Sequence, residues 1–167
     1  MSYKVTKEGS GTRGRSGDRN EKEFQTFEDL EVYRVSREFR KAMYGAARRL
    51  PDFEKYALCS QIRRAAVSLT NNIAEGHGRF HYPDQIRFIL HSRGSLEELV
   101  DDLNVCLDEN YLRSDEVATQ KDQARTVLLL INGYLRHLRR NSDAVREPDE
   151  SYSESSEQVA PLGFVTL

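Results

Sequence analysis

The stretch FEDLEVYRVSREFRKAMYGAARRL, residues 27–50, decides the fold of this chain. Apolar or small residues recur in it with the spacing 4, 3, 4, 3, 4, at Val32, Ser36, Phe39, Met43, Ala46 and Leu50. That spacing places them on one face of a helix and is typical of the buried seam of a helical bundle. Thr26 and Asp29 have the spacing of a capping box, which predicts the start of the helix, and Pro51 predicts its end.

The next stretch, residues 53–75, repeats the helical pattern with apolar residues at Leu58, Ile62, Ala65, Leu69 and Ile73. Asp52 precedes it and is a residue type that often caps the start of a helix. Gly76 and Gly78 follow it, and we expect them to be turn glycines that use their freedom in φ.

Two further stretches complete the pattern. Residues 83–110 begin with a proline, which suits the first turn of a helix, and carry a third apolar stripe. A fourth stripe follows Ser114, the expected cap, and ends at the arginine-rich residues 136–140. No segment alternates with period two over the length of a strand. The sequence therefore predicts an all-α fold, an antiparallel up-down-up-down four-helix bundle.

Both ends of the chain differ from this helical middle in composition. Residues 1–20 carry five basic and two acidic side chains, while residues 141–167 carry one basic and six acidic ones. Neither end shows apolar periodicity, so neither buries enough surface to offset the entropy of ordering. We therefore predict a disordered basic tail over residues 1–23, a bundle over 24–141 and a disordered acidic tail over 142–167.

The whole composition excludes several classes of protein. The chain has 167 residues, which suits one domain, and its longest apolar run is far shorter than a membrane span. Its first residues lack the apolar core of a secretory signal, and its two cysteines suit a reduced compartment. We expect a cytoplasmic protein that does not associate with membranes.

Two motifs are distinctive: QIRRAAVSLTNNIAEGHGR at residues 61–79 and FILHSRGSLEE at residues 88–98. Together with FEDLEV at residues 27–32, they resemble the four-helix-bundle proteins encoded in intervening sequences of 23S ribosomal RNA genes. That family includes the accessory protein of diversity-generating retroelements. The resemblance covers about residues 24–140 in order and leaves out both tails.

The resemblance implies a bundle that assembles into a homopentamer, without an established enzymatic activity for most members. The retroelement members bind a reverse transcriptase and nucleic acid through a basic face. This chain departs from that strongly basic character, because residues 21–140 carry 19 basic and 19 acidic side chains.

The family motifs contain polar residues and glycines with two interpretations. They form either a recognition cluster or subunit contact, or a structural network that ties the second helix to its neighbours. A glycine inside the third helix, in the Gly-Ser pair, predicts close approach of another helix, from the same chain or a neighbouring subunit. The motif residues are Ser68, Asn72, Glu75, Gly76, Gly78, Gly94 and Ser95.

No catalytic residue, metal ligand or cofactor is predicted. His77 and His81 have a spacing that binds metal on a continuous helix, but Gly78 lies between them and no third ligand has a signature spacing. The glycines lack the lysine and the preceding strand of a phosphate-binding loop. We therefore expect a protein that is not an enzyme.

The arginines are the main functional signal. In an antiparallel bundle the start of the first helix lies near the end of the fourth, so arginines from both are expected to form one phosphate-binding patch. The alternative is a solvated surface with ion pairs within helices. The residues assigned to this patch are Arg34, Arg37, Arg79, Arg136, Arg139 and Arg140.

These observations lead to two functional hypotheses. The first is a non-enzymatic oligomeric adaptor whose partner is RNA, DNA or a nucleic-acid enzyme such as a reverse transcriptase. The second is an oligomeric scaffold that binds only protein, in which the arginines pair with acidic partners or neighbouring subunits. The salt dependence of binding to RNA and DNA distinguishes the two.

Overall fold

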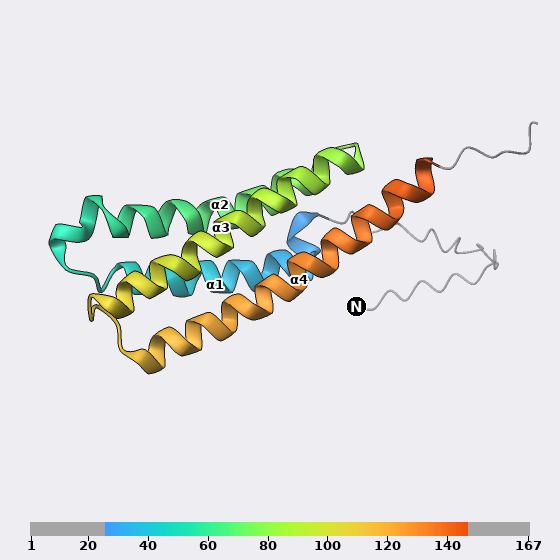
Figure 1. Cartoon of the computed structure of the whole chain (residues 1–167). Helices are drawn as coiled ribbons and strands as arrows, with labels where there is room; N and C mark the ends of the chain where they lie inside the picture. The colour runs from blue at the N-terminus through green and yellow to red at the C-terminus, as the bar shows by residue number, and fades with distance from the viewer. Residues whose placement is uncertain (1–25, 147–167) are drawn as a thin grey trace, which may run out of the picture.

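The computed structural model describes residues 26–146, and these form a four-helix bundle (Figure 1). Successive helices run in opposite directions, and α1 and α3 lie on a diagonal because each packs against α2 and α4. No strand occurs within residues 26–146, which confirms the predicted all-α class. The helices are α1 (Glu31–Ala47), α2 (Leu58–His77), α3 (Tyr82–Asp108) and α4 (Ser114–Arg146), with short 3-10 helices η1 (Phe27–Asp29) and η2 (Asp52–Tyr56).

The predicted stripes form the core. All six stripe residues of the first stretch are buried, from Val32 to Leu50, as are all five of the second, from Leu58 to Ile73. Burial of these apolar faces is the main force that holds the four helices together. The core also takes in both cysteines, Cys59 and Cys106, as small buried residues.

The predicted capping box is present but it opens a different element. The backbone N–H of Thr26 donates to Asp29 Oδ2 at 2.9 Å, and the N–H of Glu28 donates to Thr26 Oγ1 at 3.2 Å. These bonds close the single turn of η1, and α1 begins only at Glu31. The first long helix therefore starts four residues later than the sequence pattern predicts.

The prediction that Asp52 caps the second helix is wrong. Asp52 is the first residue of η2, and α2 begins at Leu58. The backbone N–H of Leu58 instead donates to Glu54 Oε2 at 3.1 Å. The other carboxylate oxygen of Glu54 accepts a hydrogen bond from the Tyr111 hydroxyl at 3.0 Å, which ties η2 to the turn between α3 and α4.

Helix α4 also differs from its predicted bounds. Ser114 is its first helical residue, and the carboxylate of Glu116 accepts from the backbone N–H of Arg113 at 3.2 Å. The helix continues to Arg146, past residue 141, where the bundle was predicted to end. The predicted basic tail and the rest of the predicted acidic tail lie outside the described residues. Among the helices within residues 26–146, none has the length and apolar character needed to cross a membrane.

Candidate interaction surfaces

Three of the family-motif residues, Ser68, Asn72 and Ser95, belong to a polar seam between α2 and α3. The Ser95 hydroxyl lies 2.8 Å from Ser68 Oγ, and Asn72 Nδ2 donates to the Ser68 carbonyl oxygen at 2.8 Å. One turn earlier on α3, the buried Ser92 hydroxyl donates to the backbone oxygen of Leu69 at 2.7 Å. The two serine bonds tie α2 to α3, while the Asn72 bond stays within α2, so the geometry favours the structural interpretation of this motif.

Gly76 lies where the first turns of α3 pack closely against α2. A Cβ atom at this position would lie 3.1 Å from Phe88 Cβ and 3.3 Å from the Gln85 carbonyl oxygen. Gly76 is therefore a packing glycine inside α2, and its expected role in a turn is wrong. Gly78 does cap α2, but its φ of −75° is an ordinary helical value that any residue adopts. For Gly94, a Cβ atom would meet nothing within 4 Å among the described residues, which contradicts the expected close approach of another helix of the same chain.

Arg79 is engaged by its neighbours within the chain. It pairs with Glu75 one turn earlier, and its guanidinium lies 4.5 Å from the centre of the Phe88 ring. Its carbonyl oxygen accepts a hydrogen bond from Gln85 Nε2 at 2.8 Å. These contacts join the end of α2 to the start of α3.

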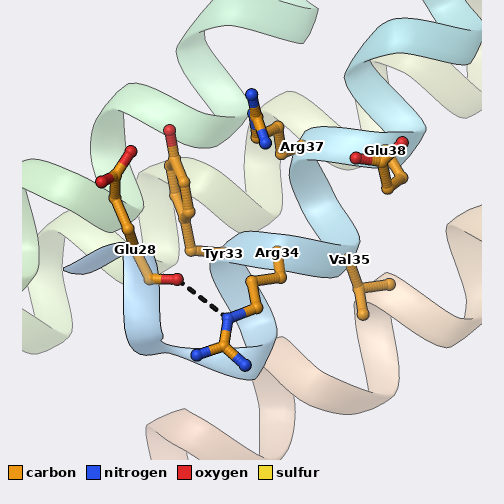
Figure 2. Close-up of a pocket in the computed structure, with 6 residues that line it drawn as sticks. All are labelled: Glu28, Tyr33, Arg34, Val35, Arg37 and Glu38. Carbon is orange, nitrogen blue, oxygen red and sulfur yellow. Dashed lines mark hydrogen bonds between the residues drawn. The ribbon is translucent and has the colours of Figure 1, made fainter. Parts of the chain in front are cut away.

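Arg34 and Arg37 belong to the same helix but point away from one another (Figure 2). Arg34 turns back to η1, where its Nε donates to the Glu28 carbonyl oxygen at 3.0 Å and its Nη2 lies 3.5 Å from Asp29 Oδ1. Arg37 points in the opposite direction in this view, although both side chains line the same hollow. The structure does not bring these two guanidinium groups together.

Arg136, Arg139 and Arg140 are exposed on the last part of α4. None of the three makes an ion pair with another described residue. No carboxylate occurs between Asp122 and Asp143, so this part of α4 carries only positive side-chain charge. Figure 1 places it at the same end of the bundle as the start of α1, although no hydrogen bond or ion pair joins the two among the described residues.

The two diagonal helices α1 and α3 carry opposite net charge, which the zero net charge of residues 21–140 conceals. Residues 31–49, which contain α1, carry six basic and two acidic side chains. Helix α3 carries two basic and six acidic side chains. Because α1 and α3 lie at diagonally opposite corners of the bundle, these two helices give it a basic side and an acidic side. A count of charge helix by helix would have revealed this from the sequence.

A second basic feature lies between α1 and α2. Arg40, Lys41, Tyr44 and Arg48 line an open groove along α1. Arg40 crosses to α2, where its Nη1 donates to the Thr70 hydroxyl at 2.7 Å. Arg40 belongs to none of the sites predicted from the sequence, because its contact with Thr70 depends on the packing of the two helices.

The acidic side includes a buried carboxyl group on α3. Asp102 is 6% exposed, and its Oδ2 has no hydrogen-bond partner among the described residues. Burial raises the pKa of Asp102 to about 6, and the nearby charges of Glu98 and Asp101 add to this effect. No group of three or more potential metal ligands gathers within residues 26–146.

The fold and these surfaces define an all-α bundle protein with a polar helix–helix seam and segregated charge on its outside. The chain belongs to the 23S rRNA-intervening sequence protein family, whose profile matches residues 28–133. This match confirms the family resemblance inferred from the motifs. Among curated proteins, none matches the sequence.

Proposed function

We propose that this protein is a non-enzymatic oligomeric adaptor that binds nucleic acid, or a ribonucleoprotein, through the exposed arginines of α4. The supporting observation is the arrangement of Arg136, Arg139 and Arg140 on an exposed surface whose helical segment contains no carboxylate. We define these three residues as the α4 arginine cluster. Arg34 and Arg79, in contrast, are each held by a neighbouring carboxylate.

The proposed mechanism is electrostatic. Arginines that neutralise phosphates release condensed counterions, so binding depends little on sequence and falls steeply as salt rises. One cluster with three arginines gives weak binding. An oligomer presents several clusters to one nucleic acid, and the effective concentration of the second contact raises the overall affinity.

The experiment is fluorescence anisotropy with labelled RNA and DNA at low and physiological salt. We expect the triple variant Arg136→Gln, Arg139→Gln, Arg140→Gln to bind all sequences more weakly, with a flatter salt dependence. Circular dichroism and light scattering should show unchanged helicity and mass, because these side chains are exposed.

A matched control separates the cluster from net charge. Arg49, Arg113 and Arg125 are already paired with carboxylates of α4, and their replacement by glutamine changes the charge of the chain by the same amount. We expect this control to retain binding, since surface ion pairs contribute little to stability. Equal loss of binding in both variants would contradict the assignment to the α4 arginine cluster. A wild-type chain that binds neither RNA nor DNA at low salt would favour the protein-only scaffold.

A further inference from the structure

Two parallel rings lie on α4 next to the α4 arginine cluster. The ring of Tyr134 and the imidazole of His137 have centroids 6.4 Å apart, and their planes are inclined by only 12°. This distance and this angle lie within the range that aromatic pairs prefer in proteins. Tyr134 is partly buried and packs against the core, so the bundle itself holds the first ring of the pair.

The second ring, His137, is exposed but has a partner on either side along the helix. Asn141 Nδ2 lies 3.1 Å from His137 Nε2, one turn further along α4. The imidazole therefore has the parallel ring of Tyr134 one turn before it and the side-chain amide of Asn141 one turn after it. A side chain that is already ordered loses less entropy when it binds a ligand. His137 thus presents a flat ring of fixed orientation at the surface.

His91 on α3 provides a contrast. It is exposed and also follows an aromatic residue by three positions, but its ring is inclined by 56° to that of Phe88. Its carbonyl oxygen accepts a hydrogen bond from the Ser95 hydroxyl, whereas its ring makes no hydrogen bond within residues 26–146. The orientation of the His137 ring is therefore a feature of its own surroundings on α4.

The arginines of the cluster continue from this ring around α4. His137 and Arg140 are three residues apart, and Arg140 and Arg136 are four apart, so each pair is adjacent on the helix surface. None of the ion pairs within residues 26–146 joins this part of α4 to a carboxylate, those at the start of α1 included. The surface combines an oriented ring with guanidinium groups that no described carboxylate neutralises.

This combination suits a single-stranded nucleic acid better than a duplex. In a duplex each base is covered on both faces by its neighbours, so an arginine-bearing surface reaches phosphates and base edges only. In a single strand a base can turn outward and stack on a side-chain ring, while arginines bind the phosphates beside it. An acidic peptide would pair with the same arginines but would leave the oriented ring without a role.

We propose that the α4 arginine cluster binds single-stranded nucleic acid, with one base stacked on His137. Arg136 and Arg140 bind phosphates of the same strand. Tyr134 and Asn141 act as positioning residues, because they hold the imidazole in its orientation. This inference rests on the proposed function and names the form of nucleic acid that the same site takes.

The first test compares one labelled oligonucleotide as a single strand and annealed to its complement, by fluorescence anisotropy. We expect wild type to bind the single strand more tightly, and RNA and DNA to behave alike, because neither contact needs the 2′-hydroxyl. His137→Ala should weaken single-strand binding by at least about fivefold, the effect of one lost stacking contact, and leave duplex binding unchanged. Equal weakening with both forms, or with neither, would overturn the proposal.

Two variants accompany this test. His137→Tyr keeps a flat ring at the same position and should retain most of the affinity for the single strand, which distinguishes the ring from other properties of histidine. His91→Ala removes an exposed histidine from α3 and should bind both forms like wild type. Circular dichroism should show unchanged helicity in all variants, because both histidines are exposed. Loss of single-strand binding in His91→Ala as large as in His137→Ala would contradict the assignment.

The second test removes the bases from the ligand instead of the ring from the protein. A DNA strand of the same length made of abasic sites keeps the phosphates and has nothing to stack. Wild type should bind it about as weakly as His137→Ala binds the complete strand, and His137→Ala should bind it no more weakly than wild type does. A loss on the abasic strand equal to that on the complete strand would show that His137 does not contact a base.

A third measurement concerns the positioning of the ring. Asn141→Ala leaves the imidazole in place and removes its partner, so the preference for single strand over duplex should fall part of the way to that of His137→Ala. A merely structural role would change the binding of both forms together. A full preference in Asn141→Ala would overturn the positioning role of this residue.

The outcomes separate this inference from the proposed function. A wild-type chain that binds neither form at low salt would overturn both. Equal binding of single strand and duplex by wild type, lost in the triple arginine variant, would leave the electrostatic function in place and overturn the stacking contact alone.

Discussion

Gly76 shows how one missing side chain sets the distance between two helices. A Cβ atom there would lie 3.1 Å from Phe88 Cβ and 3.2 Å from Ile89 Cδ1, which is closer than normal packing allows. We expect Gly76→Ala to lower the free energy of unfolding by about 1–3 kcal/mol, because α2 and α3 must move apart. Urea denaturation measures this change.

Gly78 provides the control for that prediction. Its nearest contact with an added Cβ would be ordinary, at 3.6 Å from the Glu75 carbonyl oxygen, and its φ is helical. Gly78→Ala should therefore leave stability unchanged or raise it slightly. Equal destabilisation by both substitutions would show that close packing at Gly76 is not the cause.

Asp102 gives stability an unusual dependence on pH. Because its pKa is raised from 3.8 to about 6 in the folded protein, the folded state holds the proton more tightly than the unfolded state. Its contribution is fully present below pH 3.8 and is lost as pH rises through about 6. Asp102→Asn should remove this loss and raise stability at pH 7 relative to wild type by at most about 3 kcal/mol.

Thermal denaturation of both proteins between pH 4 and pH 7.5 measures the difference. The advantage of Asp102→Asn over wild type should grow across this range, while Asp108→Asn, at an exposed position of the same helix, should show no such growth. A constant difference across the range would contradict the raised pKa. The sequence did not reveal Asp102, because a carboxylate beside an apolar stripe looks like a solvated residue.

Among the helices, the start of α2 depends on a contact between residues that are far apart in the sequence. Glu54 accepts hydrogen bonds from the Leu58 backbone and from Tyr111, far away in the sequence. Glu54→Ala should lower the free energy of unfolding by about 1–2 kcal/mol, since a partly buried donor and the first turn both lose a partner. Asp52→Ala should have almost no effect, and chemical denaturation of the two variants compares them.

Glu54 and Asp52 also show which features of the helices could be predicted from the sequence. The apolar stripes of α1 and α2 were correct, because burial imposes a helical period that the sequence displays directly. The predicted cap of α2 is wrong. Asp52 fits the local sequence rule for a helix cap, but the actual acceptor is Glu54, which is positioned by Tyr111. Contacts between residues distant in sequence leave no such periodic signal.

For the whole molecule, the sequence predicted the antiparallel bundle but concealed the distribution of its charge. The equal numbers of acidic and basic residues over 21–140 suggested a neutral body. The structure places the basic residues of α1 and the acidic residues of α3 on opposite sides. Opposed charge of this kind allows copies of one chain to attract each other, which a uniform neutral surface does not.

The acidic end of the chain is expected to compete with nucleic acid for the α4 arginine cluster. Residues 147–167 carry five carboxylates and no basic side chain, and they follow directly after the helix that bears the cluster. Deletion of residues 147–167 should therefore tighten binding to RNA and DNA several-fold at low salt. The gain should shrink at high salt, because both competing interactions are screened.

A second variant separates charge from bulk in that experiment. Replacement of the five carboxylates by their amides keeps the length of the segment and removes its charge, so it should tighten binding as much as the deletion does. Anisotropy titrations of the three proteins at two salt concentrations make the comparison. If the amide variant binds like wild type while the deletion binds more tightly, the segment acts by steric obstruction, since its charge was removed without effect. If neither change alters binding, the cluster is not in competition with the acidic segment at all.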